Sequence, residues 1–201
     1  MFRTLLPLSL SMALALPALA QDSEPAETAE PPTAGEAVPG LDMGSEVGTP
    51  QPGERYSREK HGDWDIACLK TDGETDPCSM LQIMTDPEGN PIAEYSLFRV
   101  EGGGQVAAAA SIVVPLETLL PARLTIAIDD NPAKQYQYTF CNPIGCVAQI
   151  GLTAQEIELM KKGAKATVSL VPAPAPDQRI DLDLSLTGFT AAYDKVDVVS
   201  N

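Results

Sequence analysis

The sequence is poor in basic residues. Its 201 residues include 13 lysines and arginines against 28 aspartates and glutamates, which gives a formal net charge of −15 at pH 7. A nucleic-acid-binding protein needs basic patches that meet the phosphates. Docking on anionic lipid also needs positively charged side chains. The composition therefore argues against both kinds of partner. An acidic surface of this kind favours solubility.

Histidine is almost absent, which limits the catalytic chemistry that the chain can support. A Ser-His-Asp arrangement would have to use the single histidine, His61. The serines available to it include Ser79, Ser96 and Ser111, and none of them lies in a G-x-S-x-G turn. We therefore predict that His61 is an exposed residue at the edge of the domain and that the chain has no catalytic residues.

Long apolar runs are missing after the N-terminal region. The longest, residues 106–116, is interrupted by Ser111 and Pro115. A membrane-spanning helix needs about 20 predominantly apolar residues. We therefore predict no transmembrane segment in the mature chain.

The N-terminal region has the three parts of a signal peptide. Arg3 supplies the positive charge, Leu5 to Leu16 form a short apolar stretch, and Ala18-Leu19-Ala20 is an A-x-A cleavage site. We predict that residues 1–20 are removed. The mature chain would then be exported to the periplasm of a Gram-negative bacterium, to its outer surface or into the medium.

Large apolar side chains are also scarce in residues 21–57, where Tyr56 is the first aromatic residue. This acidic segment is rich in proline, glutamate, alanine, glycine and threonine, and it cannot bury enough surface to offset its chain entropy. We predict a disordered tether, either a leader without a role or a partner-binding arm. Residues 58–197 then form one domain.

Apolar and polar residues alternate with a period of two through most of this domain, a pattern typical of half-buried strands. Tyr136, Tyr138 and Phe140 follow the pattern, and we interpret them as the inner face of one strand. The predicted strands are 64–68, 78–84, 92–100, 106–114, 124–128, 135–140, 146–151, 166–170 and 180–186.

Two helices are predicted. Thr153 and Glu156 have the spacing of a capping box at a helix start, and Lys161 and Lys162 suit the negative end of the same helix. A second, short helix is predicted for residues 190–196. Many short strands with one crossing helix predict an all-β fold, either an antiparallel β-sandwich or a partly open barrel.

The four cysteines form two close pairs, and an even cysteine count in an exported domain indicates disulfides. The local pairing, Cys68–Cys78 and Cys141–Cys146, is favoured because each pair flanks a turn, while the crossed pairings remain open. A zinc site usually has C-x2-C pairs, and a redox site usually has C-x-x-C at a helix start. The wider spacing here fits neither, so we predict structural disulfides with no metal ion or cofactor.

Clustered carboxylates are the one feature that points to an enzyme. Asp72 lies among acidic residues in one predicted loop, and Asp181 and Asp183 share one face of a predicted strand. Hydrolysis would need one acid that burial keeps protonated, whereas these acids look solvated. A secreted carboxylate-dependent hydrolase is therefore the alternative hypothesis.

Several motifs follow one another in a fixed order along residues 60–197. They are Gly62-Asp63-Trp64 with Cys68, Cys78 and Gln82; Val113-Val114-Pro115-Leu116 with Leu119-Leu120 and Leu124–Asp129; Tyr138–Cys141 with Gly145–Ala148; and Leu186–Ala192. In this order they resemble the invasion-associated locus B family of exported bacterial proteins. Glu117 stands where the family often has glycine, a departure that touches one turn.

This resemblance implies a small all-β envelope domain that is associated with host-cell invasion in some pathogens. It implies no reaction and no catalytic residues. We therefore predict a non-enzymatic binding or accessory protein. Its partner would be an envelope or host-surface protein or glycan, recognised by exposed sheet edges or faces.

Overall fold

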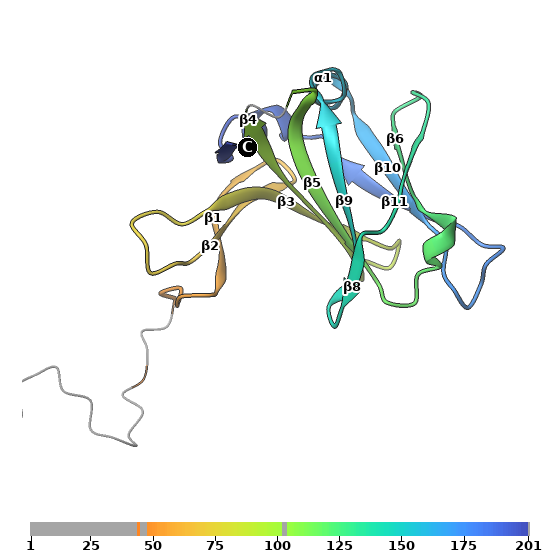
Figure 1. The fold of residues 1–201 in the computed structure, drawn as a ribbon, viewed down its shortest axis with the longest axis horizontal. Helices are drawn as coiled ribbons and strands as arrows, with labels where there is room; N and C mark the ends of the chain where they lie inside the picture. The colour runs from red at the N-terminus through yellow and green to blue at the C-terminus, as the bar shows by residue number, and fades with distance from the viewer. Residues whose placement is uncertain (1–43, 45–47, 102–103, 201) are drawn as a thin grey trace, which may run out of the picture. The chain divides into compact units, whose positions relative to one another are not determined.

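The computed structural model describes residues 44, 48–101 and 104–200. The predicted signal peptide and most of the predicted tether lie outside these residues. The predicted all-β fold is confirmed: antiparallel strands form two sheets, which do not close into a barrel, and two helices accompany them (Figure 1). No helix in the described part of the chain has the length and hydrophobicity that a membrane crossing requires.

The larger sheet has the strand order β1-β2-β3-β4-β5-β9-β8. All neighbours in this order are antiparallel, whereas an additional strand, β12, runs parallel to the end of β4. The strands of this larger sheet are β1 Arg55–His61, β2 Trp64–Leu69, β3 Cys78–Thr85, β4 Pro91–Glu101, β5 Val106–Val114, β8 Phe140–Asn142, β9 Gly145–Thr153 and β12 Val198–Ser200.

The smaller sheet has the strand order β11-β10-β6-β7. Its strands are β6 Leu124–Ile128, β7 Lys134–Tyr136, β10 Lys165–Leu170 and β11 Ile180–Ser185. A short 3-10 helix, η1 Leu120–Ala122, precedes β6. Val168 and Leu182 face each other in this sheet and are both buried, because the alternating apolar residues of β10 and β11 point to the core.

One apolar core joins the two sheets and the helices. At its centre the Trp64 ring meets Tyr95 and Phe189 edge to face, with ring centroids 5.8 and 5.5 Å apart. The Trp64 indole N–H donates a hydrogen bond to the Ser185 carbonyl oxygen at 2.9 Å. A single side chain of the larger sheet therefore contacts both the smaller sheet and the last helix.

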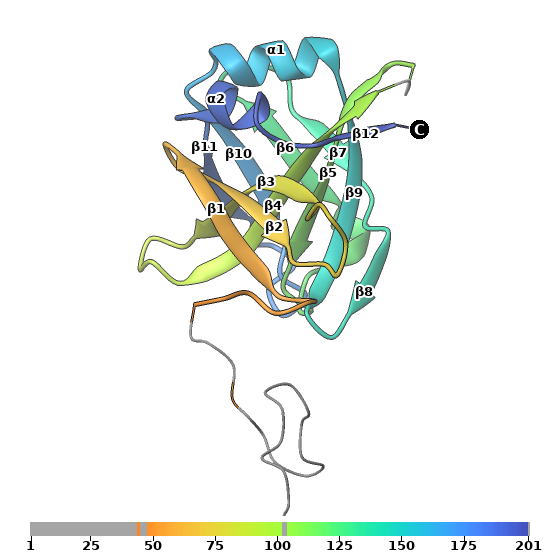
Figure 2. The same cartoon turned by 90° about the vertical axis from the view of Figure 1, so that its left-hand side faces the viewer.

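Helix α1, Ala154–Lys162, connects β9 of the larger sheet to β10 of the smaller sheet, and its predicted capping box is present. The Glu156 N–H donates to Thr153 Oγ1 at 3.3 Å, and the Thr153 N–H donates to Glu156 Oε2 at 2.9 Å. Helix α2, Phe189–Tyr193, is shorter than the helix predicted for residues 190–196. The two helices lie next to each other at one end of the sheets (Figure 2).

Two glycines allow the turn between β1 and β2 to pack against the turn before α2. Gly62 has φ 59° and Gly188 has φ 85°, a region that L side chains rarely adopt. A Cβ at Gly62 would lie 2.5 Å from the Thr187 carbonyl oxygen, and one at Gly188 would lie 2.1 Å from the His61 carbonyl oxygen. The first and last motifs of the sequence thus meet through their backbones.

The prediction of one strand over residues 135–140 is wrong. Tyr136 ends β7 in the smaller sheet, and Phe140 begins β8 in the larger sheet. The Thr139 N–H already bonds the Val147 carbonyl oxygen of β9 at 2.7 Å, and Phe140 is 47% exposed. The alternation has the same period in both strands, so it does not reveal that the chain changes sheets between them.

The strands at the two ends of the domain follow no apolar alternation. Strand β1 begins at Arg55, upstream of the boundary predicted at residue 58, and most of its residues are polar because it is an edge strand. Strand β12 has only three residues, and all are exposed. Both strands exist through their backbone pairing with β2 and β4.

Candidate functional site

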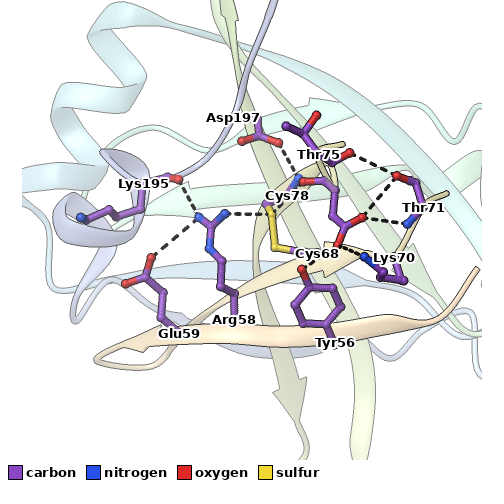
Figure 3. The surroundings of a disulfide bond; sticks show 11 residues. Tyr56, Arg58, Glu59, Cys68, Lys70, Thr71, Thr75, Cys78, Lys195 and Asp197 are labelled. Carbon is purple, nitrogen blue, oxygen red and sulfur yellow. Dashed lines mark hydrogen bonds and ion pairs between the residues drawn. A yellow bond between two sulfur atoms is a disulfide. The ribbon is translucent and has the colours of Figure 1, made fainter. Parts of the chain in front are cut away.

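Cys68 and Cys78 lie opposite each other on β2 and β3 and form a disulfide (Figure 3). Both are buried, with 0% and 5% of their surface exposed. The disulfide closes the β2–β3 hairpin at the point where the loop of residues 70–77 leaves the sheet. This loop and the residues near the C-terminus contact the disulfide from two sides.

Asp76 holds the loop in place. Its carboxylate accepts hydrogen bonds from the Thr71 N–H at 2.8 Å, the Tyr56 hydroxyl at 2.9 Å and Lys70 Nζ at 3.2 Å. The bond from the Thr71 N–H is the largest of the causes that lower the pKa of Asp76 to about 2. The hydrogen bond from the Tyr56 hydroxyl to Asp76 is in turn the largest cause that raises the pKa of Tyr56. Asp76 is therefore an ionised anchor of the loop.

Arg58 and Asp197 attach the C-terminal segment to the same disulfide. Arg58 Nη1 donates to Cys78 Sγ at 3.1 Å, and its Nη2 donates to the Lys195 carbonyl oxygen at 3.2 Å (Figure 3). The Asp197 carboxylate accepts a hydrogen bond from the Cys78 N–H at 2.6 Å. These contacts place β12, which follows Asp197, beside the end of β4.

A groove of about 840 Å³ opens between the loop and β12, and we call it the β12 groove. Its lining is polar on the loop side and carries two valines on the β12 side. The lining residues are Tyr56, Arg58, Glu74, Thr75, Asp76, Pro77, Asp197, Val198, Val199 and Ser200.

The second disulfide, Cys141–Cys146, joins opposite residues of β8 and β9. In the turn between them, Asn142 Oδ1 accepts hydrogen bonds from the Ile144 N–H at 2.9 Å and the Gly145 N–H at 3.2 Å. This turn is therefore held by both a covalent bond and an Asx-type side chain. It presents Ile144 at its tip with 83% of the residue exposed.

The outer face of the larger sheet, which points away from the core, carries several large apolar side chains among its polar ones. Leu81, Ile83, Phe98 and Val113 point outward, because their neighbours along each strand face the core. Among the described residues, Ile83 is 44% exposed and the other three are half-buried. Antiparallel sheets usually carry polar residues on the solvent side, so this face differs from an ordinary solvated one.

The charges on this face are paired with one another. Arg55 Nη1 lies 2.8 Å from Glu94 Oε2, and Lys60 Nζ lies 3.7 Å from Asp65 Oδ2. Arg55 belongs to β1 and Glu94 to β4, and in a flat sheet these strands would lie about 14 Å apart. The ion pair therefore shows that the sheet curls toward its outer face.

A hollow of about 420 Å³ lies at the end of this curled face, and we call it the outer-face hollow. Apolar side chains from β3, β4 and β5 form most of its lining, and the disulfide-closed turn of β8–β9 borders it. The lining residues are Arg55, Ile83, Pro91, Ile92, Ala93, Glu94, Val113, Val114, Pro115, Asn142 and Ile144.

A small cavity of about 60 Å³ under α1 contains a buried carboxylate. Burial opposes the ionisation of Glu156, but hydrogen bonds from Lys134 and Thr153 outweigh it and lower the pKa of Glu156. Lys134 Nζ lies 2.7 Å from Glu156 Oε1. Burial also raises the pKa of Tyr136, which contacts Glu156, to about 12. These contacts connect β7 to α1. The cavity itself is too small for an organic substrate.

The carboxylates of the hydrolase hypothesis lie on separate elements. Asp181 and Asp183 are on β11 and pair with Arg179 at 2.8 Å and with Lys165 at 2.9 Å. Asp72 lies in the β2–β3 loop, and no hydrogen bond or ion pair among residues 48–101 and 104–200 joins it to either of them. No group of three or more His, Cys, Asp or Glu side chains suited to a metal ion occurs in this part of the chain.

His61 is less exposed than expected, with 20% of its side chain accessible, and its Nε2 lies 3.1 Å from Glu59 Oε2. It faces the same side as Trp64, its partner across β1 and β2. Ser79, Ser96 and Ser111 alternate with core-facing residues and therefore lie on the outer face. The structure does not bring the histidine and these serines together.

The sequence analysis did not identify Arg58, Asp76 and Asp197 as one cluster, since Asp197 lies at the other end of the domain in sequence. It also did not identify the outer face. A signal for this face was present in the adjacent apolar pairs of β3, Met80-Leu81 and Ile83-Met84. Side chains of neighbouring residues in a strand point to opposite faces of the sheet, so adjacent apolar residues place apolar side chains on both faces.

Comparisons with known proteins agree with this architecture. The family model described as "Invasion associated locus B (IalB) protein" matches residues 64–197. Two Invasion protein B homologs, from Brucella abortus strain 2308 and from biovar 1 strain 9-941, are each 25% identical over 143 residues. These residues span 71% of this chain and 80% of each relative.

A solved structure shares the fold. The crystal structure of invasion associated protein B from Bartonella henselae matches with a TM-score of 0.56 at 20% sequence identity. The match covers 67% of this chain and 90% of that chain. Because the family model also spans both disulfides and the core residues from Trp64 to Val196, the chain belongs to the invasion-associated locus B family.

Proposed function

We propose that this protein is an exported, non-enzymatic binding or accessory protein of the bacterial envelope or cell surface, with a role in host interaction. The relatives that match it are named for invasion, and their names refer to no reaction. The leader of residues 1–20 supports export. The two disulfides support a location in an oxidising compartment such as the periplasm or the cell surface.

The observation that carries the proposal is the outer face of the larger sheet. It combines exposed apolar side chains with charges that are already paired, in a chain with a net charge of −15. Exposed apolar side chains that gather on one face are a feature of interaction surfaces in soluble proteins. The hollow beside Ile83 and Ile144 offers a place for an apolar group of the partner.

The test is crosslinking in cells from chosen positions on this face. A photo-reactive residue replaces Ile83 or Ile144 in the tagged full chain. The matched control replaces Asp130, which is exposed in the turn between β6 and β7 of the smaller sheet. We expect both outer-face positions, and not Asp130, to capture the same envelope or host-surface component. Capture that is equal at Asp130, or absent at both outer-face positions, would contradict the proposed role of this face.

A further inference from the structure

Strand β12 has one edge that no strand of the described chain covers. It pairs with β4 alone, as residues 198–200 run parallel to residues 99–101. The β12 groove lies on its other side, between β12 and residues 74–77. Figure 3 shows the residues that fix one end of this groove, with Asp197 above the disulfide and Tyr56 below it.

The direction of the β12 backbone groups follows from its pairing with β4. In a parallel ladder, alternate residues direct both their N–H and C=O groups to the same neighbouring strand. The Arg99 N–H donates to the Asp197 carbonyl oxygen at 3.1 Å. With Val198 opposite Arg99, Val199 is therefore the β12 residue that bonds β4. The N–H and C=O groups of Val198 and Ser200 point to the groove.

The other free edges of the two sheets carry protective features, and β12 shares only one of them, its short length. Strand β1 has a register shift between Ser57 and Glu59 and several charged residues. Strand β11 carries Asp181 and Asp183, and β7 and β8 are only three residues long. Bulges, charges and short length are the usual means that prevent further strand pairing.

By contrast, β12 is short but carries no charge and has two exposed valines. Val198 is 45% exposed and Val199 is 49% exposed. Its unpaired backbone groups face a hollow rather than bulk solvent, because residues of the 70–77 loop form the opposite wall. An edge of this kind accepts an additional strand.

The charge of the groove indicates the chemistry of that strand. Glu74, Asp76 and Asp197 supply three carboxylates to the lining, and Arg58 supplies one cation. The Arg58 guanidinium is already engaged by Cys78 Sγ, the Lys195 carbonyl oxygen and the Glu59 carboxylate. Asp76 is likewise paired with Lys70, and Asp197 accepts the Cys78 N–H, whereas Glu74 is exposed. The lining therefore carries more negative than positive charge, and Glu74 is the carboxylate most open to an approaching peptide.

We propose that the β12 groove binds an extended peptide segment of a partner protein that carries basic side chains and adds to β12 as a strand. Basic side chains on one face of this segment would lie near the carboxylates, and the valines would contact its apolar side chains, because side chains alternate between the two faces of a strand. The proposal rests on the binding role proposed above and names a partner class for a second surface. A second copy of this chain is a poor occupant, since both copies are strongly acidic.

A designed peptide tests the proposal directly. The probe is a fluorescently labelled octapeptide of alternating lysine and valine with capped ends, and its counterpart has glutamate in place of lysine. Both are titrated into the full chain by fluorescence anisotropy at low and at high salt. We expect saturable binding of the lysine peptide that weakens with salt, and no binding of the glutamate peptide. In amide hydrogen exchange, the lysine peptide should protect the amides of Val198 and Ser200.

Two pairs of variants separate backbone pairing from side-chain and charge effects. Val198→Pro removes an N–H that faces the groove and leaves the Val199 N–H for β4, so affinity should fall about tenfold, whereas Val198→Ala should retain most of the affinity. The second pair tests charge: Glu74→Gln should weaken binding of the lysine peptide about threefold. Its control, Glu88→Gln in the turn between β3 and β4, should have no effect. The fluorescence of buried Trp64 shows whether each variant is folded.

Several results would overturn the proposal. These are absence of binding at millimolar peptide, equal affinity for the two peptides, or full affinity in folded Val198→Pro. Concentration-dependent self-association that Val198→Pro abolishes would instead assign the edge to a second copy. A failure here, together with specific capture from Ile83 and Ile144, would remove this site and leave the proposed function intact. Specific peptide binding without capture from Ile83 and Ile144 would support the β12 groove and contradict the proposed role of the outer face.

Discussion

At the scale of single residues, ionised and buried polar side chains hold segments that have little regular structure. Asp76 is the clearest case, because one carboxylate fixes the Thr71 backbone, the Tyr56 hydroxyl and the Lys70 ammonium group. Its pKa of about 2 lies below the ordinary value of 3.8. Its stabilising contacts are therefore complete above about pH 4 and are lost as the pH falls toward 2.

We expect Asp76→Asn to lower the Tm at neutral pH and to flatten the decrease of Tm between pH 4 and pH 2. The amide retains the shape of the side chain and loses its charge, so its contacts with Thr71 and Lys70 weaken. The measurement is thermal unfolding followed by circular dichroism over this pH range. Asp72→Asn in the same exposed loop is the control and should behave as the parent. If the Tm of Asp76→Asn fell between pH 4 and pH 2 as steeply as that of the parent, another carboxylate would govern the acid stability.

At the scale of elements, both disulfides join residues that are already opposite each other on neighbouring strands. They therefore stabilise hairpins that the turn and the strand pairing also define, and they do not determine the topology. The Cys141–Cys146 hairpin is the more exposed of the two, and its tip presents Ile144 to the outer-face hollow. Rigidity of this turn is thus relevant to binding as well as to stability.

The double variant Cys141→Ser/Cys146→Ser should lose about 2 kcal/mol of unfolding free energy by the chain-entropy relation for a closed loop of this length. Its far-UV circular dichroism should remain that of a β protein. Urea unfolding measures the loss. The variant Cys68→Ser/Cys78→Ser should lose more, since its loop is longer and the disulfide also contacts Arg58. A parent-like midpoint for the first variant would mean that its bridge does not contribute.

At the scale of the whole domain, one buried amide links the two sheets. Gln82 on β3 is 7% exposed and reaches β11, where its Oε1 accepts a hydrogen bond from the Ser185 N–H at 2.8 Å. Its Nε2 donates to the Ser185 carbonyl oxygen at 3.1 Å and to the Asp63 carbonyl oxygen at 3.3 Å. The side chain satisfies the Ser185 N–H, which the edge of the smaller sheet would otherwise leave unpaired, and it shares the Ser185 carbonyl oxygen with the Trp64 indole.

We expect Gln82→Leu to cost about 1 to 3 kcal/mol, because the Ser185 N–H then has no buried partner. Equilibrium unfolding in urea gives the value. Gln149→Leu is the matched control, since Gln149 is exposed on β9, and it should change stability by less than about 0.5 kcal/mol. Equal effects of the two substitutions would show that the hydrogen bonds of Gln82 do not contribute to stability.

The elements that could be predicted from the sequence are those whose signals are local. The alternation in β10 and β11 predicted both strands, and the spacing of Thr153 and Glu156 predicted the start of α1. The change of sheet between Tyr136 and Phe140 depends on which strands are available for pairing, and that information lies elsewhere in the chain.

The candidate sites depend still more on distant residues. The β12 groove requires Arg58 and Asp76 to meet Asp197, which most of the domain separates from them in sequence. The curl that forms the outer-face hollow becomes visible only through the ion pair between Arg55 and Glu94. No short motif encodes either arrangement, so a sequence pattern alone does not predict them.

The contact between Trp64 and Phe189 also sets an order of events during folding. Trp64 lies on the second strand of the domain, and the ring that covers it belongs to the last helix. A chain made from its N-terminus must therefore keep the apolar side of its first hairpin uncovered until almost all of the domain is available. Such distant pairings fold slowly, and the first strands to emerge are among the last to be buried.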